Sequence, residues 1–404
     1  MFSSIGGLVS VPKIGFQLLS DDAWRFGIIY LMDLFYAVEQ TYTSREALFC
    51  LFHNVQQSVP AELGSAVNEV LCYSPPTKFG RTWLMDRTVK RLLRCDLDLA
   101  QVLFLRRHRV QVVVSGQLLP FGPMIPMLSL IPDFQHVCLP EMFSVKERQI
   151  RDELYNAMAE RSARVLLFSE SVKADFERFA PSFAHKARVL KPVSCVPSSV
   201  YQDNPQQLSD FYHLPCKFVY LPNQFWKHKN HGVVFRAMRK LKEKGTEIFL
   251  VCSGYPGDDR HPMYFAGLLQ ELAISGIRNQ VAFLGLLPRE HVFRLMRQSV
   301  CVINPSLFEG YGMTVDEARS LGKQLLVSDL PSHHEQNLPQ AIFFDPHDSA
   351  DLAEKLNQVW NEKSPGPDLD LEEEACSALP ARVTKYAESF MSVVQEVVVG
   401  ATRL

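Results

Sequence analysis

The second half of the chain alternates short, continuous apolar runs with longer amphipathic runs. KFVYLPN (217–223), EIFLVCSG (247–254) and SVCVINPS (299–306) have the length and the β-branched and aromatic content of strands. Gly245 and Gly276 end the amphipathic runs that follow the first two, as glycines commonly end helices. Strands that are apolar throughout and separated by helices form parallel sheets covered on both faces. We therefore predict a doubly wound, Rossmann-like α/β domain in this half.

The first half repeats this alternation less regularly and predicts a second domain of the same kind. The elements expected there are a helix at 25–40 and strands at 13–19, 47–53, 111–114, 126–131 and 164–168. Residues 191–215 hold four prolines and little apolar periodicity, which is typical of a linker. The predicted division is a first domain at 12–195, a linker at 191–215, a second domain at 216–365 and a C-terminal helix at 380–404.

Charge and cysteine content exclude several classes of protein. With 42 Lys and Arg against 44 Asp and Glu, the chain lacks the cationic excess that bulk nucleic-acid binding needs. Nine cysteines without a Cys-x-x-Cys pair fit neither a disulfide framework nor a structural zinc site. The first residues show no secretory signal. We therefore expect a cytoplasmic protein.

One uncharged stretch, Val110 to Pro132, is long enough to cross a bilayer as a helix. It contains four prolines and two glycines, which interrupt helical hydrogen bonds that lipid cannot replace. We expect a strand and a loop there rather than a membrane span.

The segment SLFEGYGMTVDEA (306–318) lies where a strand of the second domain ends and a helix begins near Met313. Its two glycines allow a tight turn, and the helix N-terminus offers partial positive charge to an anion. Glu309 precedes the glycines and Glu317 lies about one turn inside the helix. Because carboxylates repel phosphate, we expect both to accept hydrogen bonds from neutral hydroxyls of a sugar or a ribose.

This Glu-x7-Glu pattern around Gly-x-Gly resembles the signature of retaining glycosyltransferases of family 4, which have the GT-B fold of two Rossmann-like domains facing across a cleft. PNQFWKHKNH (222–231), IPDFQHVCLPEMFS (131–144) and SDLPSHHEQ (328–336) match further motifs of that family in order. The resemblance covers about residues 12 to 360. It implies a donor-binding second domain, an acceptor-binding first domain, hinge closure across the linker, and a last helix that crosses back to the first domain.

The resemblance also implies roles for individual residues. Glu309 would contact the donor sugar, Glu317 the nucleotide ribose and Lys229 the diphosphate. The remaining residues expected at the donor are Gly310, Tyr311, Gly312, Gln224, Lys227 and Gly27.

Three positions depart from the family or match it less closely. Many relatives have an arginine where this chain has Gln224, so Lys227 is a candidate second cation. In the first domain Gly27 is kept, but Phe26 replaces a neighbouring glycine. His136 is the expected first-domain histidine near the reacting carbon, with Asp133 beside it on the acceptor side.

The implied activity is transfer of a sugar from a UDP- or GDP-linked donor to a glycan or lipid-linked acceptor, as in cell-surface polysaccharide synthesis. It would be retaining and metal-independent, with no cofactor: the leaving diphosphate is stabilised by Lys229, backbone amides and the helix N-terminus. Alternatives are a nucleotide-sugar epimerase or a phosphorylase of the same fold, or a non-catalytic sugar-nucleotide-binding descendant. A phosphorylase would need a pyridoxal-phosphate lysine, which the chain does not identify.

Some motifs admit other interpretations. His333, His334 and Glu335 invite a metal site, but adjacent side chains diverge, and we favour a structural role. Asp96 and Asp98 form a D-x-D string outside the nucleotide-binding context. Cys138 near His136 is not evidence for a nucleophile pair.

A predicted basic helix at 81–94 could contact an anionic membrane or acceptor. Its apolar stripe is flanked by the cations Arg87, Lys90, Arg91 and Arg94. A core-packed helix with a solvated face is the simpler interpretation. The membrane alternative would put the protein at the inner face of the membrane.

Overall fold

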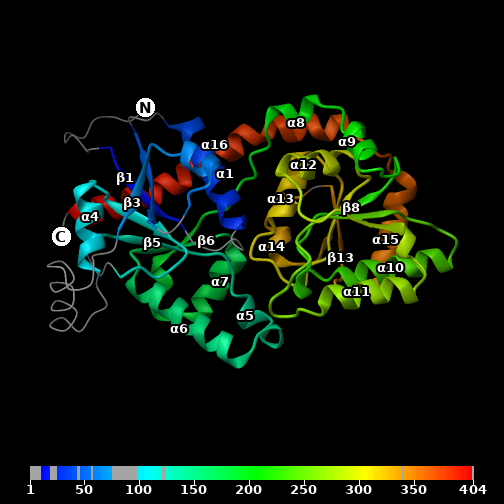
Figure 1. Cartoon of the computed structure of the whole chain (residues 1–404), viewed down its shortest axis with the longest axis horizontal. Helices are drawn as coiled ribbons and strands as arrows, with labels where there is room; N and C mark the ends of the chain where they lie inside the picture. Colours follow the sequence, from blue (N-terminus) through cyan, green and yellow to red (C-terminus); the bar gives the residue numbers. More distant parts are fainter. Residues whose placement is uncertain are drawn as a thin grey trace.

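A computed structural model of the chain describes residues 11–18, 25–42, 46–55, 58–74, 98–120, 124–338 and 340–402. They form two α/β domains side by side, joined by a crossing segment and by the last helix (Figure 1). The predicted GT-B architecture of two Rossmann-like domains is confirmed.

The first domain is built on a parallel sheet in the order β3-β2-β1-β4-β5-β6-β7. Its strands are β1 (Lys13–Gln17), β2 (Leu48–Asn54), β3 (Glu69–Tyr73), β4 (Val112–Ser115), β5 (Met127–Ile131), β6 (Arg164–Leu167) and β7 (Ala187–Val189). Its helices are α1 (Arg25–Thr41), α2 (Ala61–Ser65), α4 (Leu99–Arg107), α5 (Gln135–Cys138), α6 (Val145–Arg161) and α7 (Glu170–Phe179), with 3-10 turns at Pro140–Met142 and Pro181–Lys186.

The second domain is built on a parallel sheet in the order β10-β9-β8-β11-β12-β13. Its strands are β8 (Val219–Leu221), β9 (Leu250–Cys252), β10 (Val281–Phe283), β11 (Val302–Asn304), β12 (Leu325–Ser328) and β13 (Ala341–Phe344). Its helices are α10 (His231–Glu243), α11 (Tyr264–Ile274), α12 (Arg289–Gln298), α13 (Met313–Ser320), α14 (Pro331–His334) and α15 (Ser349–Glu362), with 3-10 turns at Lys227–Lys229 and Arg278–Gln280.

Strand order determines where a ligand can bind. In the second sheet the order reverses between β8 and β11, which pair side by side. Loops that leave two such neighbouring strands diverge to opposite faces and open a crevice at the carboxyl end of the sheet. The loops after β8 and β11 are those that carry Lys229 and Glu309. Figure 1 shows α13 and α14 on the side of this domain that faces the first.

The segment predicted as a linker contains two short helices, α8 (Ser198–Gln202) and α9 (Gln206–Phe211). The buried Arg297 of α12 donates to the carbonyl oxygens of Val200 and Asp203, at 2.5 and 2.8 Å. It also pairs with Glu372 at 2.7 Å. These bonds attach the crossing segment to the second domain.

The last helix, α16 (Leu369–Thr402), begins at the second domain and ends against α1 of the first (Figure 1). It starts eleven residues before the expected 380, so that residues 369–379 are also helical. Pro380, which resembles a helix start, lies inside it. Near its end, Glu396 accepts hydrogen bonds from Arg164 and Arg188.

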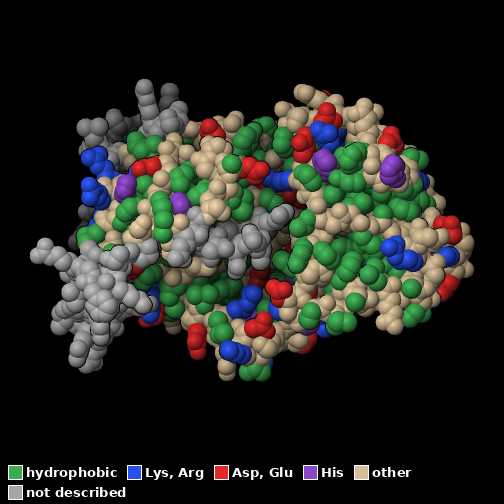
Figure 2. Space-filling model, in the orientation of Figure 1, with side chains coloured by type: hydrophobic (Ala, Val, Ile, Leu, Met, Phe, Trp, Pro, Cys, Tyr) green, Lys and Arg blue, Asp and Glu red, His purple; other side chains and the backbone are tan. Residues whose placement is uncertain are grey.

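The apolar core is continuous between the domains. One cluster extends from β1 and α1 through the buried face of α16 to β8, α12 and α13. Separate clusters cover the other faces of the two sheets. The face in Figure 2 shows acidic and basic side chains interspersed rather than gathered by sign.

Among the residues that the structure describes, none of the helices combines the length and apolar character required to traverse a bilayer. Within 110–132, β4 and β5 form as expected.

Candidate functional site

Glu309 lies at the centre of a compact cluster of polar side chains within the second domain. Its Oε1 accepts from Lys229 Nζ at 2.6 Å, from Ser306 Oγ at 2.6 Å and from Asn304 Nδ2 at 3.4 Å. The Glu309 side chain is 9% exposed and that of Lys229 is 15% exposed. Although burial opposes ionisation, Lys229 and Ser306 lower the pKa of Glu309 to about 2. The carboxylate is therefore ionised at neutral pH.

The loop that carries Lys229 is held by Asn230, which adopts a left-handed conformation with φ 54°. Its Nδ2 donates to the carbonyl oxygens of Pro305 and Pro346, at 3.0 and 2.8 Å. This attaches the loop after β8 to the loop after β11. The structure thus brings Lys229 and Glu309 together, although they are 80 residues apart in sequence.

The N-terminus of α13 is the second element of the site. Gly312 is its N-cap, with φ 90°, and no side chain caps the helix. Asp316 in the first turn accepts from Ser194 N at 2.7 Å and pairs with Arg382 of α16. The expected turn at Gly312 is therefore present, and the helix start has no anionic cap of its own.

Gly310 has a role that we did not predict. A Cβ atom at this position would overlap the carbonyl oxygen of Pro132 in the first domain. The Gly310 carbonyl accepts from Ser169 Oγ of the first domain at 2.6 Å. Tyr311 is 5% exposed and its hydroxyl points to Asp316 at 3.4 Å, so its ring packs inside the second domain. The glycine is required because two backbones approach closely here.

Glu317 lies in a different environment, at the contact between the domains. Its Oε1 accepts from Arg289 Nε at 3.3 Å. Arg289 also donates through both terminal nitrogens to the carboxylate of Asp33 on α1, at 2.8 and 2.7 Å. Burial raises the pKa of Glu317 to about 7, although Arg289 lowers it.

Sequence reasoning missed Arg289 and Asp33. Asp33 is a lone acidic residue among apolar neighbours in the predicted helix RFGIIYLMDLFYAV, and its side chain is 4% exposed. A buried carboxylate needs a charged or hydrogen-bonding partner, so Asp33 itself indicated that such a partner lies nearby. Nothing in the sequence indicated which cation it would meet, 256 residues away.

His136 is not where we expected it. Its ring is buried between Phe134, Phe143, Tyr155 and Phe179, and its Nε2 lies 3.2 Å from Asp152 Oδ1 on α6. Burial lowers its pKa. With 1% of its side chain exposed, the ring is not accessible to a ligand in this structure.

The neighbouring Asp133 does lie at the contact between the domains. Its Oδ1 accepts from Gln135 N at 2.9 Å, and its Cβ faces Gly310. The exposed Cys138 contacts Asp175 rather than His136.

The other expected donor contacts are dispersed. Gln224 Oε1 accepts from Tyr255 N at 2.6 Å, so this side chain secures a loop. Lys227 is exposed, and its backbone N–H donates to Asp258 at 2.9 Å. Gly27 lies inside α1 rather than in a loop.

The residues that suggested a metal site have separate partners. His333 Nδ1 bonds to the Ser328 carbonyl oxygen at 2.8 Å, and His334 pairs with Asp329 at 2.6 Å. Glu335 accepts from the backbone N–H groups of Glu170 and Ser171, at 2.7 and 2.6 Å. Glu335 thus caps α7 of the first domain.

Of the D-x-D pair, Asp98 caps α4 by accepting from Gln101 N at 2.9 Å, while Asp96 lies outside the described residues. The predicted basic helix at 81–94 also lies outside them. In the part of the chain that is described, no three His, Cys, Asp or Glu side chains are grouped as metal ligands.

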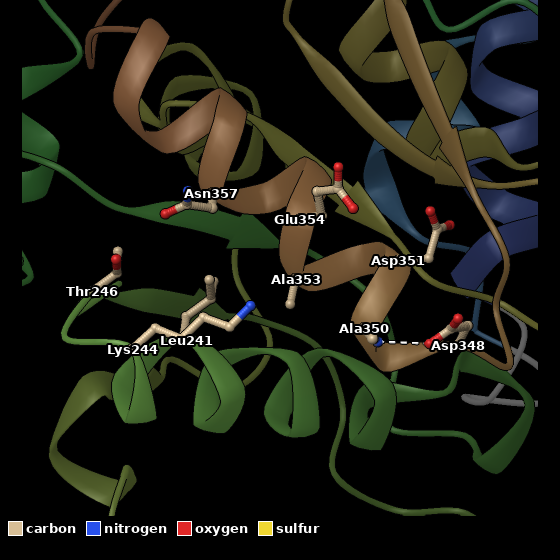
Figure 3. A pocket seen from close by; sticks show the side chains of 9 residues that line it. All are labelled: Leu241, Lys244, Thr246, Asp348, Ala350, Asp351, Ala353, Glu354 and Asn357. Carbon is tan, nitrogen blue, oxygen red and sulfur yellow. Dashed lines mark hydrogen bonds between the residues drawn. The ribbon is translucent and has the colours of Figure 1, made fainter.

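A pocket of 660 Å³ lies elsewhere, between α10 and α15 (Figure 3). Its acidic residues have local roles: Asp348 caps α15 by accepting from Ala350 N at 2.7 Å, and Asp351 pairs with Lys355 at 2.7 Å. No expected site residue lines it. It is distinct from the cluster at β8 and β11.

Comparison with known proteins identifies relatives of part of the chain. Residues 215–376 match the family model described as glycosyl transferases group 1. The serotype-specific mannosyltransferase WbdA of Escherichia coli is 26% identical over 235 residues, which cover 54% of this chain. The match spans only 28% of that relative's length.

Solved structures resemble the whole chain. HepE of Anabaena, in complex with UDP and glucose, aligns with a TM-score of 0.64 and 15% identity over 97% of this chain and 100% of its own. WaaG, a glycosyltransferase involved in lipopolysaccharide biosynthesis, aligns with a TM-score of 0.57 and 14% identity over 93% and 95%. At these identities the likeness concerns the fold.

Proposed function

We propose that this chain, whose residues 215–376 match the family model of glycosyl transferases group 1, transfers a hexose from a UDP- or GDP-linked donor with retention of configuration. The acceptor is a glycan or a lipid-linked glycan of a cell-surface polysaccharide. The relatives support this proposal by their names: WbdA is a mannosyltransferase, HepE holds UDP and glucose, and WaaG acts in lipopolysaccharide biosynthesis.

The observation that carries the proposal is the Lys229–Glu309 pair at the switch between β8 and β11. Lys229 has three N–H donors, so it can keep Glu309 and also bind a diphosphate oxygen. The N-terminus of α13 follows Glu309 within four residues and supplies further N–H groups. The ionised Glu309 would then accept from a hydroxyl of the donor sugar.

The chemistry follows from the leaving group. Cleavage of the bond between the anomeric carbon and the phosphate oxygen leaves an oxocarbenium-like sugar and places new charge on the diphosphate. Lys229 and the α13 amides would stabilise that charge as preorganised donors. We propose that the acceptor attacks from the face that the diphosphate leaves and that the diphosphate takes the proton, with no metal and no protein nucleophile.

The acceptor would enter from the first domain, where Asp133 lies against Gly310. Action at the inner face of the membrane remains part of the proposal. It is consistent with a lipid-linked acceptor, and the 81–94 segment is the candidate contact.

A donor panel tests the proposal. The purified protein is incubated with UDP- and GDP-hexoses while thermal shift and slow donor hydrolysis are measured. We expect one nucleotide to stabilise the protein, and hydrolysis to be lost in Glu309→Gln and Lys229→Ala but kept in Lys227→Ala, which removes an exposed lysine from the same loop. Proton NMR of the released sugar reports the anomeric configuration.

Three results would contradict it. Absence of a response to every nucleotide sugar would overturn the proposal. Conversion of the donor to its epimer would favour the epimerase alternative. Binding of a nucleotide sugar with neither donor hydrolysis nor transfer to any acceptor of a glycan panel would favour a non-catalytic descendant.

A further inference from the structure

Arg289 connects two carboxylates that come from different domains. It forms two short bonds to Asp33 on α1, at 2.8 and 2.7 Å, and one longer bond to Glu317 on α13, at 3.3 Å. The Asp33 and Glu317 side chains are 4% and 13% exposed, and that of Arg289 is 24% exposed. These three residues form what we call the Asp33–Arg289–Glu317 bridge.

The bridge is asymmetric, and the asymmetry favours Glu317 as the ligand-binding member. Asp33 receives both arms of the guanidinium and also the backbone N–H of Cys195 at 3.2 Å. From the described residues, the Glu317 side chain receives only the Nε hydrogen of Arg289, on one of its two oxygens. A bidentate Arg–carboxylate pair fixes the plane of the guanidinium. Asp33 therefore orients Arg289, and Arg289 orients Glu317.

The charges around Glu317 also indicate that its state depends on Arg289. Burial raises the pKa of Glu317 to about 7 even with Arg289 beside it, and the negative charges of Asp33 and Asp316 add a smaller contribution in the same direction. Removing the guanidinium would leave three acidic groups close together without that cation. A protonated or rotated Glu317 would be a poorer acceptor for hydroxyl groups.

We propose that Arg289 is a positioning residue that, held by Asp33 of the first domain, orients Glu317 of the second domain to accept hydrogen bonds from the ribose of the nucleotide donor. This inference rests on the proposed function, which places a nucleotide beside Glu317. It adds that the ribose contact depends on the domain arrangement seen here, because Asp33 and Glu317 belong to different domains.

The experiment uses the full chain and the nucleoside diphosphate that the donor panel selects. Its affinity is measured by calorimetry alongside that of its 2′,3′-dideoxy counterpart. We expect Arg289→Gln and Glu317→Gln each to weaken ribonucleotide binding about tenfold, the effect of one charge-assisted hydrogen bond, and to leave dideoxynucleotide binding within about twofold. The double variant is expected to lose no more affinity for the ribonucleotide than either single variant loses.

The control is Arg260→Gln. Arg260 also connects the domains, through Gln135 at 3.2 Å and the ring of Phe143, but does not contact Glu317. This substitution should not alter the ratio of the affinities for the ribonucleotide and the dideoxynucleotide. If Arg289→Gln does not fold, Arg289→Lys and Asp33→Asn replace it, and each is expected to lower that ratio.

Equal losses for both nucleotides in the Arg289 variants, or no loss at all, would overturn the positioning role while the proposed function stands. If wild-type protein binds no nucleoside diphosphate, the proposed function fails and this inference with it.

Discussion

Glu309 and Glu317 belong to one sequence motif, yet the structure gives them opposite environments. Glu309 is paired within the second domain by Lys229 and Ser306, and its pKa is lowered to about 2. Glu317 shares Arg289 with Asp33 of the first domain, and its pKa is raised to about 7. The spacing of the two residues is a property of the motif. Their charge states differ because Lys229 and Ser306 outweigh burial at Glu309, whereas burial outweighs Arg289 at Glu317.

The largest expected effect concerns the pair within the domain. Lys229→Ala should reduce kcat/KM for donor turnover by about 10²- to 10³-fold, because a preorganised donor to the leaving diphosphate is lost. Lys227→Ala should change it less than about twofold. Steady-state kinetics with the selected donor measures both, and equal effects of the two substitutions would refute the assignment of Lys229.

The second prediction concerns stability and pH. Because folding lowers the pKa of Glu309, its stabilising contribution is present above about pH 4.5 and is lost as the pH falls toward 2. Because folding raises the pKa of Glu317, the folded state is favoured below pH 4.5, and that advantage is lost as the pH rises from 4.5 to 7.

At pH 8, therefore, Glu309→Gln should lower the free energy of unfolding and Glu317→Gln should raise it. Allowing half of each shift for retained hydrogen bonds, the two variants should differ by about 3 kcal/mol. Urea unfolding at pH 8 and pH 5 measures this. The contrast would not hold if both substitutions destabilised the protein equally at pH 8.

A smaller effect is expected at the glycine between the two carboxylates. Gly310→Ala should cost about 1–2 kcal/mol, because its Cβ would push against the Pro132 carbonyl of the first domain. Gly267→Ala, on the exposed surface of α11 with no atom within 4 Å of the added Cβ, should be neutral or stabilising. Thermal unfolding compares them, and small-angle X-ray scattering reports whether Gly310→Ala separates the domains.

The smallest effect is expected at Glu335, which belongs to the second domain and caps α7 of the first. Glu335→Gln keeps an acceptor but removes the charge that complements the helix N-terminus, so we expect a loss of about 0.5–1 kcal/mol. Raising the salt concentration should shrink the difference from wild type. A loss that is insensitive to salt would argue against the charge effect.

Local pattern predicted most of the strands and helices, but not β3, β7, α8 or α9. Apolar runs separated by amphipathic runs predicted both parallel sheets, because strands buried on both faces must be apolar throughout. Glu309 was predicted from its place in the glycine-containing loop between a strand and a helix, whereas Lys229 was expected from the family resemblance.

Contacts between distant segments were not available from pattern. The bond from Arg289 to Asp33 spans 256 residues, and the overlap of Gly310 with Pro132 exists only when two domains meet. His136 was predicted from its motif to face a ligand, but Tyr155 of α6, Phe179 of α7 and the flanking Phe134 and Phe143 enclose it. The α16 helix begins earlier than expected, and near its start Glu372 pairs with Arg297, a residue 75 positions away.

The order of residues along the chain thus specified the strands, the helices and the loop where Glu309 and Glu317 lie, since these follow from periodicity and from glycine, proline and helix-end chemistry. Which carboxylate is ionised and which histidine is inaccessible follow from burial and charge in the folded domains, and which glycine is indispensable follows from the contact between them. These depend on distances that no local pattern encodes.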